Sequence, residues 1–186
     1  CTPRELPALR EKELRCACRE LGIAPPIFLG YQDSKLSEVD PEKIVSEIKV
    51  VINKFRPQIM ITFGEDGLSG HPDHIAIGRF ALDAFDQSKY VSVLYTPAVP
   101  VSLADYLGMT QIKAAPDEDI THIIDISDTC EEKMAAIHCH QSQLGESPIL
   151  DSDLKKQQLF LGTEHFRLAK SKNLNMNNDL LHWLDR

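Results

Sequence analysis

The chain has 186 residues, of which 42% are hydrophobic and 26% charged, and its formal net charge is −8. This length is typical of one folded unit, so we expect a single domain over residues 1–186. The acidic balance and the scattered Lys and Arg residues exclude the basic surface that nucleic acids or acidic lipids require. No apolar run approaches the about 20 residues that a membrane-spanning helix needs, so no membrane span is expected.

Hydrophobic spacing, capping residues and prolines predict alternating helices and strands along the chain. We expect helices over residues 4–21, 41–55, 72–86 and 128–141, and another in the tail sequence DLLHWLDR, 179–186. We expect strands over residues 27–29, 58–63, 91–95 and 121–126. The stretch 96–119 is dotted with prolines and predicts an irregular excursion over the surface.

This alternation predicts the α/β class: a Rossmann-like, doubly wound and mostly parallel sheet flanked by helices. In such sheets ligands bind beyond the carboxyl ends of the strands. The strand at 58–63 is followed by the loop GEDGLSG, 64–70, in which three glycines allow sharp turns and close approach to a ligand. The sequence therefore predicts a functional site at this edge of the sheet.

The cysteines are odd in number and lack the paired spacing of a structural zinc site. The five are Cys1, Cys16, Cys18, Cys130 and Cys139. Cys16 and Cys18 are two residues apart on a predicted helix, so their side chains diverge. Free thiols in a cytoplasmic protein are the simplest interpretation.

The sequence SGHPDHIA, 69–76, follows the glycine-rich loop directly. Pro72 suits the first position of a helix, and His71 before it is biased towards an extended backbone. His74 then lies in the first turn, so both imidazoles can point into one crevice. A helix start that happens to contain histidines explains the pattern equally well, but a zinc ion would accept His74 as one ligand.

The remaining histidines and the loop carboxylates carry weaker signals. Structural roles are favoured for five histidines: His122, His138, His140, His165 and His182. Glu65 and Asp66 are interpreted as solvated loop carboxylates, although either could act as a base if the loop folded inward.

The GHPDH sequence after a strand resembles the second signature of the LmbE/PIG-L-like zinc deacetylases, which act on N-acetylglucosamine moieties. Four other fragments resemble family motifs in the same order: LREKEL (9–14), FLGYQDSKL (28–36), KMAAIHCHQSQ (133–143) and EHF (164–166). Each fragment is weak alone, but five in the correct order are specific. They span most of the chain.

One family motif is missing from the printed sequence. The first signature, Ala-His-Pro-Asp-Asp-Glu at the end of the first strand, would supply two metal ligands and the general base. We expect this first β-α-β segment to lie upstream of Cys1, so that GHPDH is half of a site. A catalytically degenerate relative that only binds sugar is the alternative.

The resemblance implies a role for each matching residue. His74 would be a metal ligand, and His71 a protonated group that stabilises the oxyanion or protonates the leaving amine. Asp73 would hydrogen-bond an imidazole and hold its tautomer, and Arg10 and Asp33 would contact sugar hydroxyls. Without the resemblance, Arg10 is equally well a solvated helix residue, and Asp33 a turn residue.

The implied function is a zinc-dependent N-deacetylase in which metal-activated water attacks the acetyl group of a small amino-sugar substrate. Another divalent metal could replace zinc, and a homo-oligomer is left open. A non-catalytic sugar-binding relative would lack the His-Pro-Asp-Asp run upstream. A nucleotide-binding protein is a third hypothesis, but GEDGLSG lacks the G-x-G-x-x-G spacing and Pro72 removes a phosphate-binding N–H.

Overall fold

The computed structural model of the chain describes residues 5–145, 150 and 152–172. These residues belong to two compact units, which are described separately below. One comprises residues 1–28 and 124–164, and the other residues 29–123 and 165–186. The predicted tail helix and His182 lie outside the described residues, and the single-domain prediction stays a prediction.

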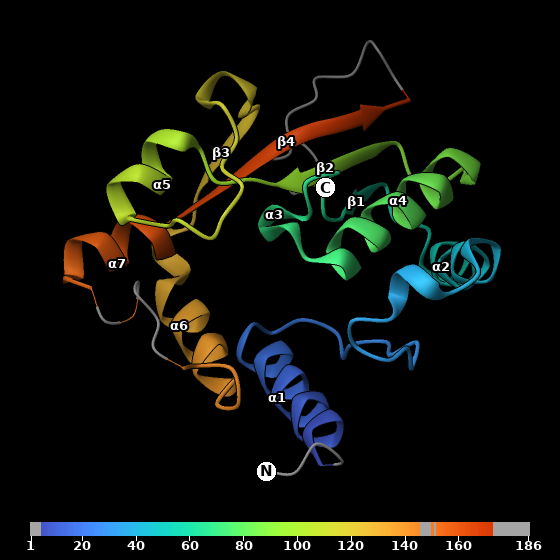
Figure 1. Ribbon diagram of the computed structural model, residues 1–186, viewed down its shortest axis with the longest axis horizontal. Helices are drawn as coiled ribbons and strands as arrows, with labels where there is room; N and C mark the ends of the chain where they lie inside the picture. The colour runs from blue at the N-terminus through green and yellow to red at the C-terminus, as the bar shows by residue number, and fades with distance from the viewer. Residues whose placement is uncertain (1–4, 146–149, 151, 173–186) are drawn as a thin grey trace. The chain divides into compact units, whose positions relative to one another are not determined.

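The larger unit is built on two long helices that the sequence predicted. Helix α2 spans Pro41–Phe55, and the side chain of Asp40 accepts a hydrogen bond from Glu42 N–H at 3.0 Å, which caps the helix. Helix α4 spans Pro72–Gln87. The two helices pack against each other, as Figure 1 shows in cyan and green.

The sheet has the strand order β1-β2-β4-β3. The strands are β1 (Ile59–Ile61), β2 (Val93–Pro97), β3 (His122–Asp125) and β4 (Thr163–Ser171). Strand β1 pairs in parallel with β2, whereas β4 is antiparallel to β2. The bonds from Thr121 N to Phe166 O and from Ile126 N to Gly162 O run in opposite sequence directions, so β3 is also antiparallel to β4.

The α/β class is therefore confirmed, but the prediction of a mostly parallel sheet is wrong for the described strands, which form a mixed sheet. The reason is β4, a nine-residue strand that the sequence analysis did not assign. It lies between β2 and β3 and is antiparallel to both of them.

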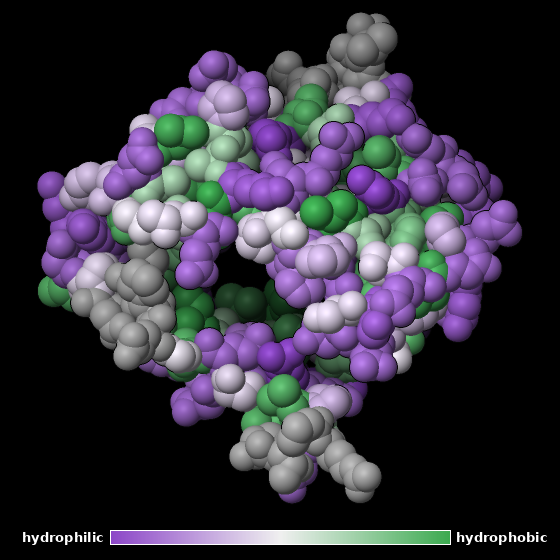
Figure 2. Space-filling view, in the orientation of Figure 1, coloured by the Kyte–Doolittle hydropathy of each residue, from purple (hydrophilic) through white to green (hydrophobic). Residues whose placement is uncertain are grey.

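The core of this unit lies between α2, α4 and the sheet. Ile44, Ala84 and Phe85 are completely buried, and Leu94 of β2 packs in the same cluster. Polar side chains cover most of the face visible in Figure 2 over these helices, as expected for helices with one apolar side. This packing holds the start of α4 beside the end of β1.

Two predictions fail in the connecting segments. Residues 27–29 form no strand; Ile27, Phe28 and Leu29 are exposed, and no described strand pairs with them. The stretch 96–119 is not wholly irregular, because it contains helix α5 (Val101–Leu107) and the short helix η2 (Asp117–Asp119). Gly108, in the left-handed conformation, ends α5. The segment η1 (Leu36–Glu38) precedes α2.

The described part of the smaller unit contains three α-helices. They are α1 (Leu6–Glu20), α6 (Cys130–Cys139), which the short segment η3 (Ser127–Thr129) precedes, and α7 (Leu154–Leu161). Helices α1 and α6 pack against each other. None of the helices in the described part of the chain is long and apolar enough to cross a membrane.

The smaller unit also corrects the prediction of free thiols. Cys16 of α1 and Cys139 of α6 form a disulfide between residues 123 positions apart. Cys18 and Cys130 are free, in agreement with the prediction. The pairing escaped the sequence analysis because two helices that are distant in sequence bring the sulfur atoms together.

Candidate active site

The GHPDH sequence forms the start of α4, with Pro72 at its first position as predicted. His71 is the N-cap residue and has an extended backbone, with φ −63° and ψ 130°. Its Nδ1 atom accepts a hydrogen bond from Asp73 N–H at 3.2 Å. Because an accepting nitrogen carries no proton, the neutral ring of His71 has its proton on Nε2.

His74 is oriented by two contacts from the preceding strand and loop. Its Nδ1 lies 3.0 Å from the carbonyl oxygen of Gly67, and its ring stacks on Phe63 with 3.9 Å between centroids. A carbonyl oxygen only accepts, so Nδ1 of His74 donates and the lone pair is on Nε2. This arrangement is typical of metal-ligating histidines, whose second nitrogen is held by a carbonyl or a carboxylate.

The approach of Gly67 to α4 depends on its being glycine. Its φ is +63°, and a Cβ built on it would lie 2.9 Å from Ile75 Cγ1 and 3.1 Å from His74 Cβ. Gly78 lies on α4 one turn after His74 and has a similar role, since a Cβ built on it would lie 2.4 Å from Phe63 O. Any larger residue at these positions would push the loop and the helix apart and move His74.

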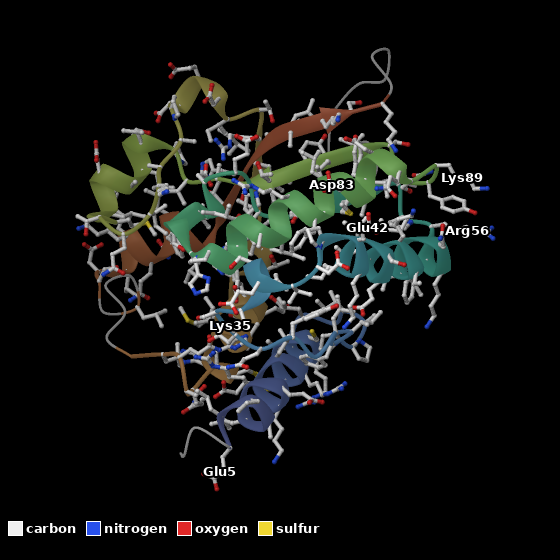
Figure 3. All side chains as sticks on the ribbon, turned by 45° about the vertical axis from the view of Figure 1, so that its right-hand side comes forward. Glu5, Lys35, Glu42, Arg56, Asp83 and Lys89 are labelled. Carbon is white, nitrogen blue, oxygen red and sulfur yellow. A yellow bond between two sulfur atoms is a disulfide. The ribbon has the colours of Figure 1, made fainter. Side chains whose placement is uncertain are left out.

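The carboxylate of Asp73 is turned towards a different segment of the larger unit. It accepts hydrogen bonds from the backbone N–H groups of Ser34 at 2.6 Å and Leu36 at 3.0 Å. Figure 3 labels Lys35, which lies between these two residues. Asp73 therefore fixes the segment that carries the exposed Asp33, and its own link to an imidazole runs through its backbone N–H.

The predicted residues are thus brought together in part. Asp33, His71, Asp73 and His74 belong to the larger unit, in which the bonds of Asp73 connect the segment beside Asp33 to the start of α4. Arg10 lies half-buried on α1 and belongs to the smaller unit.

Asp66 has a structural role that the sequence analysis missed. Its carboxylate pairs with Arg167 of β4 at 2.6 Å and accepts from Leu68 N–H at 2.7 Å. Partial burial raises the pKa of Asp66, but the bonds from Leu68 and Arg167 outweigh it and lower the pKa overall. Asp66 is therefore an ionised anchor for the glycine-rich loop rather than a proton acceptor.

A cavity of about 540 Å³ lies beside this anchor, among the loop, α4, β2 and β4. Its lining includes Phe63, Asp66, Arg79 and Arg167. None of its lining residues is a predicted site residue, although Phe63 contacts His74. The cavity is therefore linked to the GHPDH sequence through Phe63 and is not lined by it.

Residues from three of the family-like fragments contact one another in the smaller unit. Glu13, only 5% exposed, accepts hydrogen bonds from Ser142 N–H at 2.7 Å and Ser142 Oγ–H at 2.6 Å. Lys133 of α6 pairs with Glu164 at 2.7 Å. These pairs join LREKEL to HCHQSQ, and KMAA to EHF. Glu13, Ser142, Lys133 and Glu164 thus make contacts that hold the unit together.

Two of the other described histidines have side-chain contacts of a structural kind. His122 lies between Tyr95 and Thr121, and His140 contacts Gln143 after the end of α6. Among residues 5–145, 150 and 152–172, no histidine belongs to a group of three donors placed to share a metal ion. The described residues therefore offer His74 as one prepared ligand, which is fewer than the three that a catalytic zinc requires.

Comparison with known proteins identifies the family. The family model described as "PIG-L: GlcNAc-PI de-N-acetylase" matches residues 2–85. A 1D-myo-inositol 2-acetamido-2-deoxy-alpha-D-glucopyranoside deacetylase of Acidothermus cellulolyticus is 30% identical over 203 residues, covering 89% of this chain and 69% of the relative. The chain belongs to the PIG-L family of deacetylases.

Other PIG-L relatives differ in their named substrates. The protein named "Probable N-acetyl-alpha-D-glucosaminyl L-malate deacetylase 2" of Bacillus cereus is 31% identical, covering 74% of this chain and 59% of its own length. The solved N,N'-diacetylchitobiose deacetylase of Pyrococcus horikoshii matches with a TM-score of 0.60 at 22% identity, covering 89% of this chain and 64% of that one. This structural match shows the shared fold. The chain spans about two thirds of the length of such relatives.

Proposed function

We propose that this PIG-L protein is a zinc-dependent hydrolase that removes the N-acetyl group from an N-acetylglucosamine-type substrate through a metal-activated water. The proposal rests on His74, whose ring is fixed by Gly67 O and Phe63 with its lone pair on Nε2. The relatives named as deacetylases of N-acetylated sugars support the substrate class.

His74 would hold the metal through Nε2, together with ligands outside the described residues. When bound, the metal would polarise the amide carbonyl and activate a water molecule; zinc is proposed, and another divalent metal is the alternative. Because the described residues supply one ligand, no further step is assigned to the metal.

The remaining site residues would act on the substrate. His71 would donate a hydrogen bond from Nε2 to the carbonyl oxygen as negative charge develops there. To pass a proton to the leaving amine it would first take up a second proton at Nδ1, which would break the bond from Asp73 N–H. Asp73 would keep His71 and the segment beside Asp33 in register. Arg10 and Asp33 would contact sugar hydroxyls, as the family motifs imply.

The wider context of the protein follows the same proposal. We propose a doubly wound sheet for the whole protein, a small amino-sugar conjugate as its partner, and a cytoplasmic location. A homo-oligomer is left open. The Cys16–Cys139 bridge would have to be reducible in that compartment, because stable disulfides are rare there.

The test measures free amine released from a panel of N-acetylglucosamine conjugates, and zinc per chain, using the whole protein that the gene encodes. We expect His74→Ala to lose bound zinc and amine release together. His138→Ala, an exposed histidine on α6, is the matched control and should keep both. Amine release that persists in His74→Ala would refute the assignment.

The same assay addresses the non-catalytic alternative. The described residues contain one prepared ligand, which is the observation that favours a sugar-binding relative without catalysis. Saturable binding of a conjugate with no amine release at stoichiometric zinc would support that alternative.

A further inference from the structure

The smaller unit contains a cluster of two cysteines and a carboxylate that the proposed deacetylation does not use. Cys16 lies on α1, and Glu20 follows it by four residues, so both side chains lie on the same face of the helix. Cys139 comes from α6, with its Cα 5.7 Å from that of Cys16. The two Sγ atoms and a carboxylate oxygen of Glu20 all lie within 4.8 Å of one another.

These three donors are of the types that zinc binds. Zinc takes thiolates at about 2.3 Å and carboxylates at about 2.0–2.2 Å, which places tetrahedral ligand atoms about 3–4 Å apart. The donor atoms are already within that range or slightly beyond it, apart from the bonded sulfurs. Once the S–S bond is broken, small side-chain rotations would suffice to surround an ion.

The backbone around the cluster also favours a cation. Glu20 is the last residue of α1 and Cys139 is the last residue of α6. Helix C-termini carry partial negative charge, which stabilises a nearby cation. The negative ends of two helix dipoles therefore lie at, or within one turn of, the same three side chains.

A second contact keeps the cluster assembled without the disulfide. The buried Glu13 on α1 holds Ser142, three residues beyond Cys139, through two hydrogen bonds. This contact and the packing of α1 on α6 do not depend on the S–S bond. The reduced cysteines would therefore stay close to each other and to Glu20.

We propose that reduction converts the Cys16–Cys139 bridge into a binding site for Zn²⁺ formed by two thiolates and the Glu20 carboxylate. An external dithiol gives two electrons and two protons to the S–S bond and is itself oxidised to a disulfide. Zn²⁺ then displaces the two thiol protons and binds both sulfurs. Both cysteines are half-buried, so a small dithiol can reach them.

The test uses the full 186-residue chain carrying His74→Ala, so that the proposed catalytic ligand cannot contribute. Co²⁺ is the probe, because thiolate ligation gives a charge-transfer absorption band that nitrogen and oxygen ligands do not. We expect the band in the reduced chain and its absence from the oxidised chain. Cys16→Ser and Cys139→Ser should each abolish the two-thiolate band, and Glu20→Gln should weaken Co²⁺ binding about 10- to 100-fold.

Two variants serve as matched controls. Cys18→Ser removes a free cysteine from the same helix, and Glu11→Gln removes an exposed acid there that pairs with Arg15. Both should leave the band and the Co²⁺ affinity unchanged. A band that is lost in Cys18→Ser but kept in Cys16→Ser would overturn the proposal.

A second measurement avoids variants that fold poorly. The reduced wild-type chain is alkylated with and without Zn²⁺, and the modified cysteines are mapped by peptide mass. Zn²⁺ should slow the alkylation of Cys16 and Cys139 but not of the free, half-buried Cys130. Equal rates with and without Zn²⁺ at Cys16 and Cys139 would refute the site, as would a reduced chain that gives no Co²⁺ band.

Discussion

His71 and His74 are three residues apart and use their Nδ1 atoms in opposite ways. In His71 this atom accepts from Asp73 N–H, and in His74 it faces a carbonyl oxygen and must donate. His71 therefore presents an N–H at Nε2, whereas His74 presents a lone pair there. An Nε2–H can donate to a substrate oxygen and an Nε2 lone pair can bind a metal ion. The division of roles that the family resemblance implied stays a prediction.

The two histidines should fail differently when they are replaced in the whole encoded protein. His74→Ala should lose zinc along with the deacetylation rate, because it removes a ligand. His71→Ala should keep nearly stoichiometric zinc while turnover falls by about 10²–10³, the usual cost of one oxyanion donor. Zinc per chain and kcat measured on the same preparations check this. Loss of zinc from His71→Ala alone would reverse the two assignments.

Asp73 shows how far a residue could be predicted. Its place in the first turn of α4 followed from Pro72 and the helix pattern. Its carboxylate partners did not, because they are backbone N–H groups 37 and 39 residues away, which no side-chain pattern marks. The contact between Asp73 and the His71 imidazole is made by the backbone N–H of Asp73 and not by its carboxylate, which was the group predicted to make it; a catalytic role of the carboxylate stays a prediction.

Asp73→Asn should lower the free energy of unfolding by about 1–3 kcal/mol. The amide keeps one accepting oxygen and turns an N–H group towards a backbone donor, so one of the two bonds is lost. Asp83→Asn, at an exposed position of the same helix labelled in Figure 3, should change stability by less than about 0.5 kcal/mol. Urea unfolding curves of both variants provide the comparison; equal midpoints would contradict the proposed bonds.

At the scale of whole elements, the helices were predicted best. The capping residues Asp40 and Pro41 and the apolar face of α2 predicted both ends of this helix correctly, since capping and periodicity are local properties. Strand β4 was missed because TEHFRLAKS is rich in charged residues and poor in β-branched ones. Its pairing with β2 stabilises it, and this tertiary contact is not visible in the sequence.

The contact between α1 and the turn after α6 should make stability depend on pH. The Ser142 hydroxyl lowers the pKa of Glu13 most strongly; burial opposes this, and Ser142 N–H and His140 add to the lowering. The pKa of Glu13 in the folded chain lies below the ordinary value of 4.5. At pH values between the folded and the unfolded pKa, the unfolded chain therefore binds more protons than the folded chain. The stabilisation is therefore complete above the unfolded pKa and is lost as the pH falls through the folded one.

Glu13→Gln should reduce the loss of unfolding free energy at acidic pH, and Glu11→Gln should not. Glu11 is exposed and pairs only with Arg15 among the contacts described for its side chain. The measurement is urea unfolding at a series of pH values from neutral to below 4. If Glu13→Gln loses as much unfolding free energy at acidic pH as the wild type does, the two hydrogen bonds to Ser142 do not hold this carboxylate in its ionised form.

For the molecule as a whole, the decisive contacts join residues that are far apart in sequence. Glu13 and Ser142 are separated by 129 residues, Cys16 and Cys139 by 123, and Asp66 and Arg167 by 101. The family-like fragments could be recognised in order from the sequence. Which fragments contact each other could not be predicted, because those contacts depend on the tertiary fold. Both compact units accordingly draw on early and late segments of the chain.

The disulfide is the strongest of these long-range connections, and its removal should be measurable in the whole chain. Closing a loop of this length is worth about 5 kcal/mol in the chain-entropy model, and native bridges typically contribute about 2–5 kcal/mol. We expect the double variant Cys16→Ser/Cys139→Ser, without added metal, to lose about this much unfolding free energy in urea. Amide hydrogen exchange should accelerate most in α1 and α6, which the bridge connects. Cys18→Ser controls for the loss of a cysteine from α1, and a double variant as stable as wild type would show that the bridge does not constrain the chain.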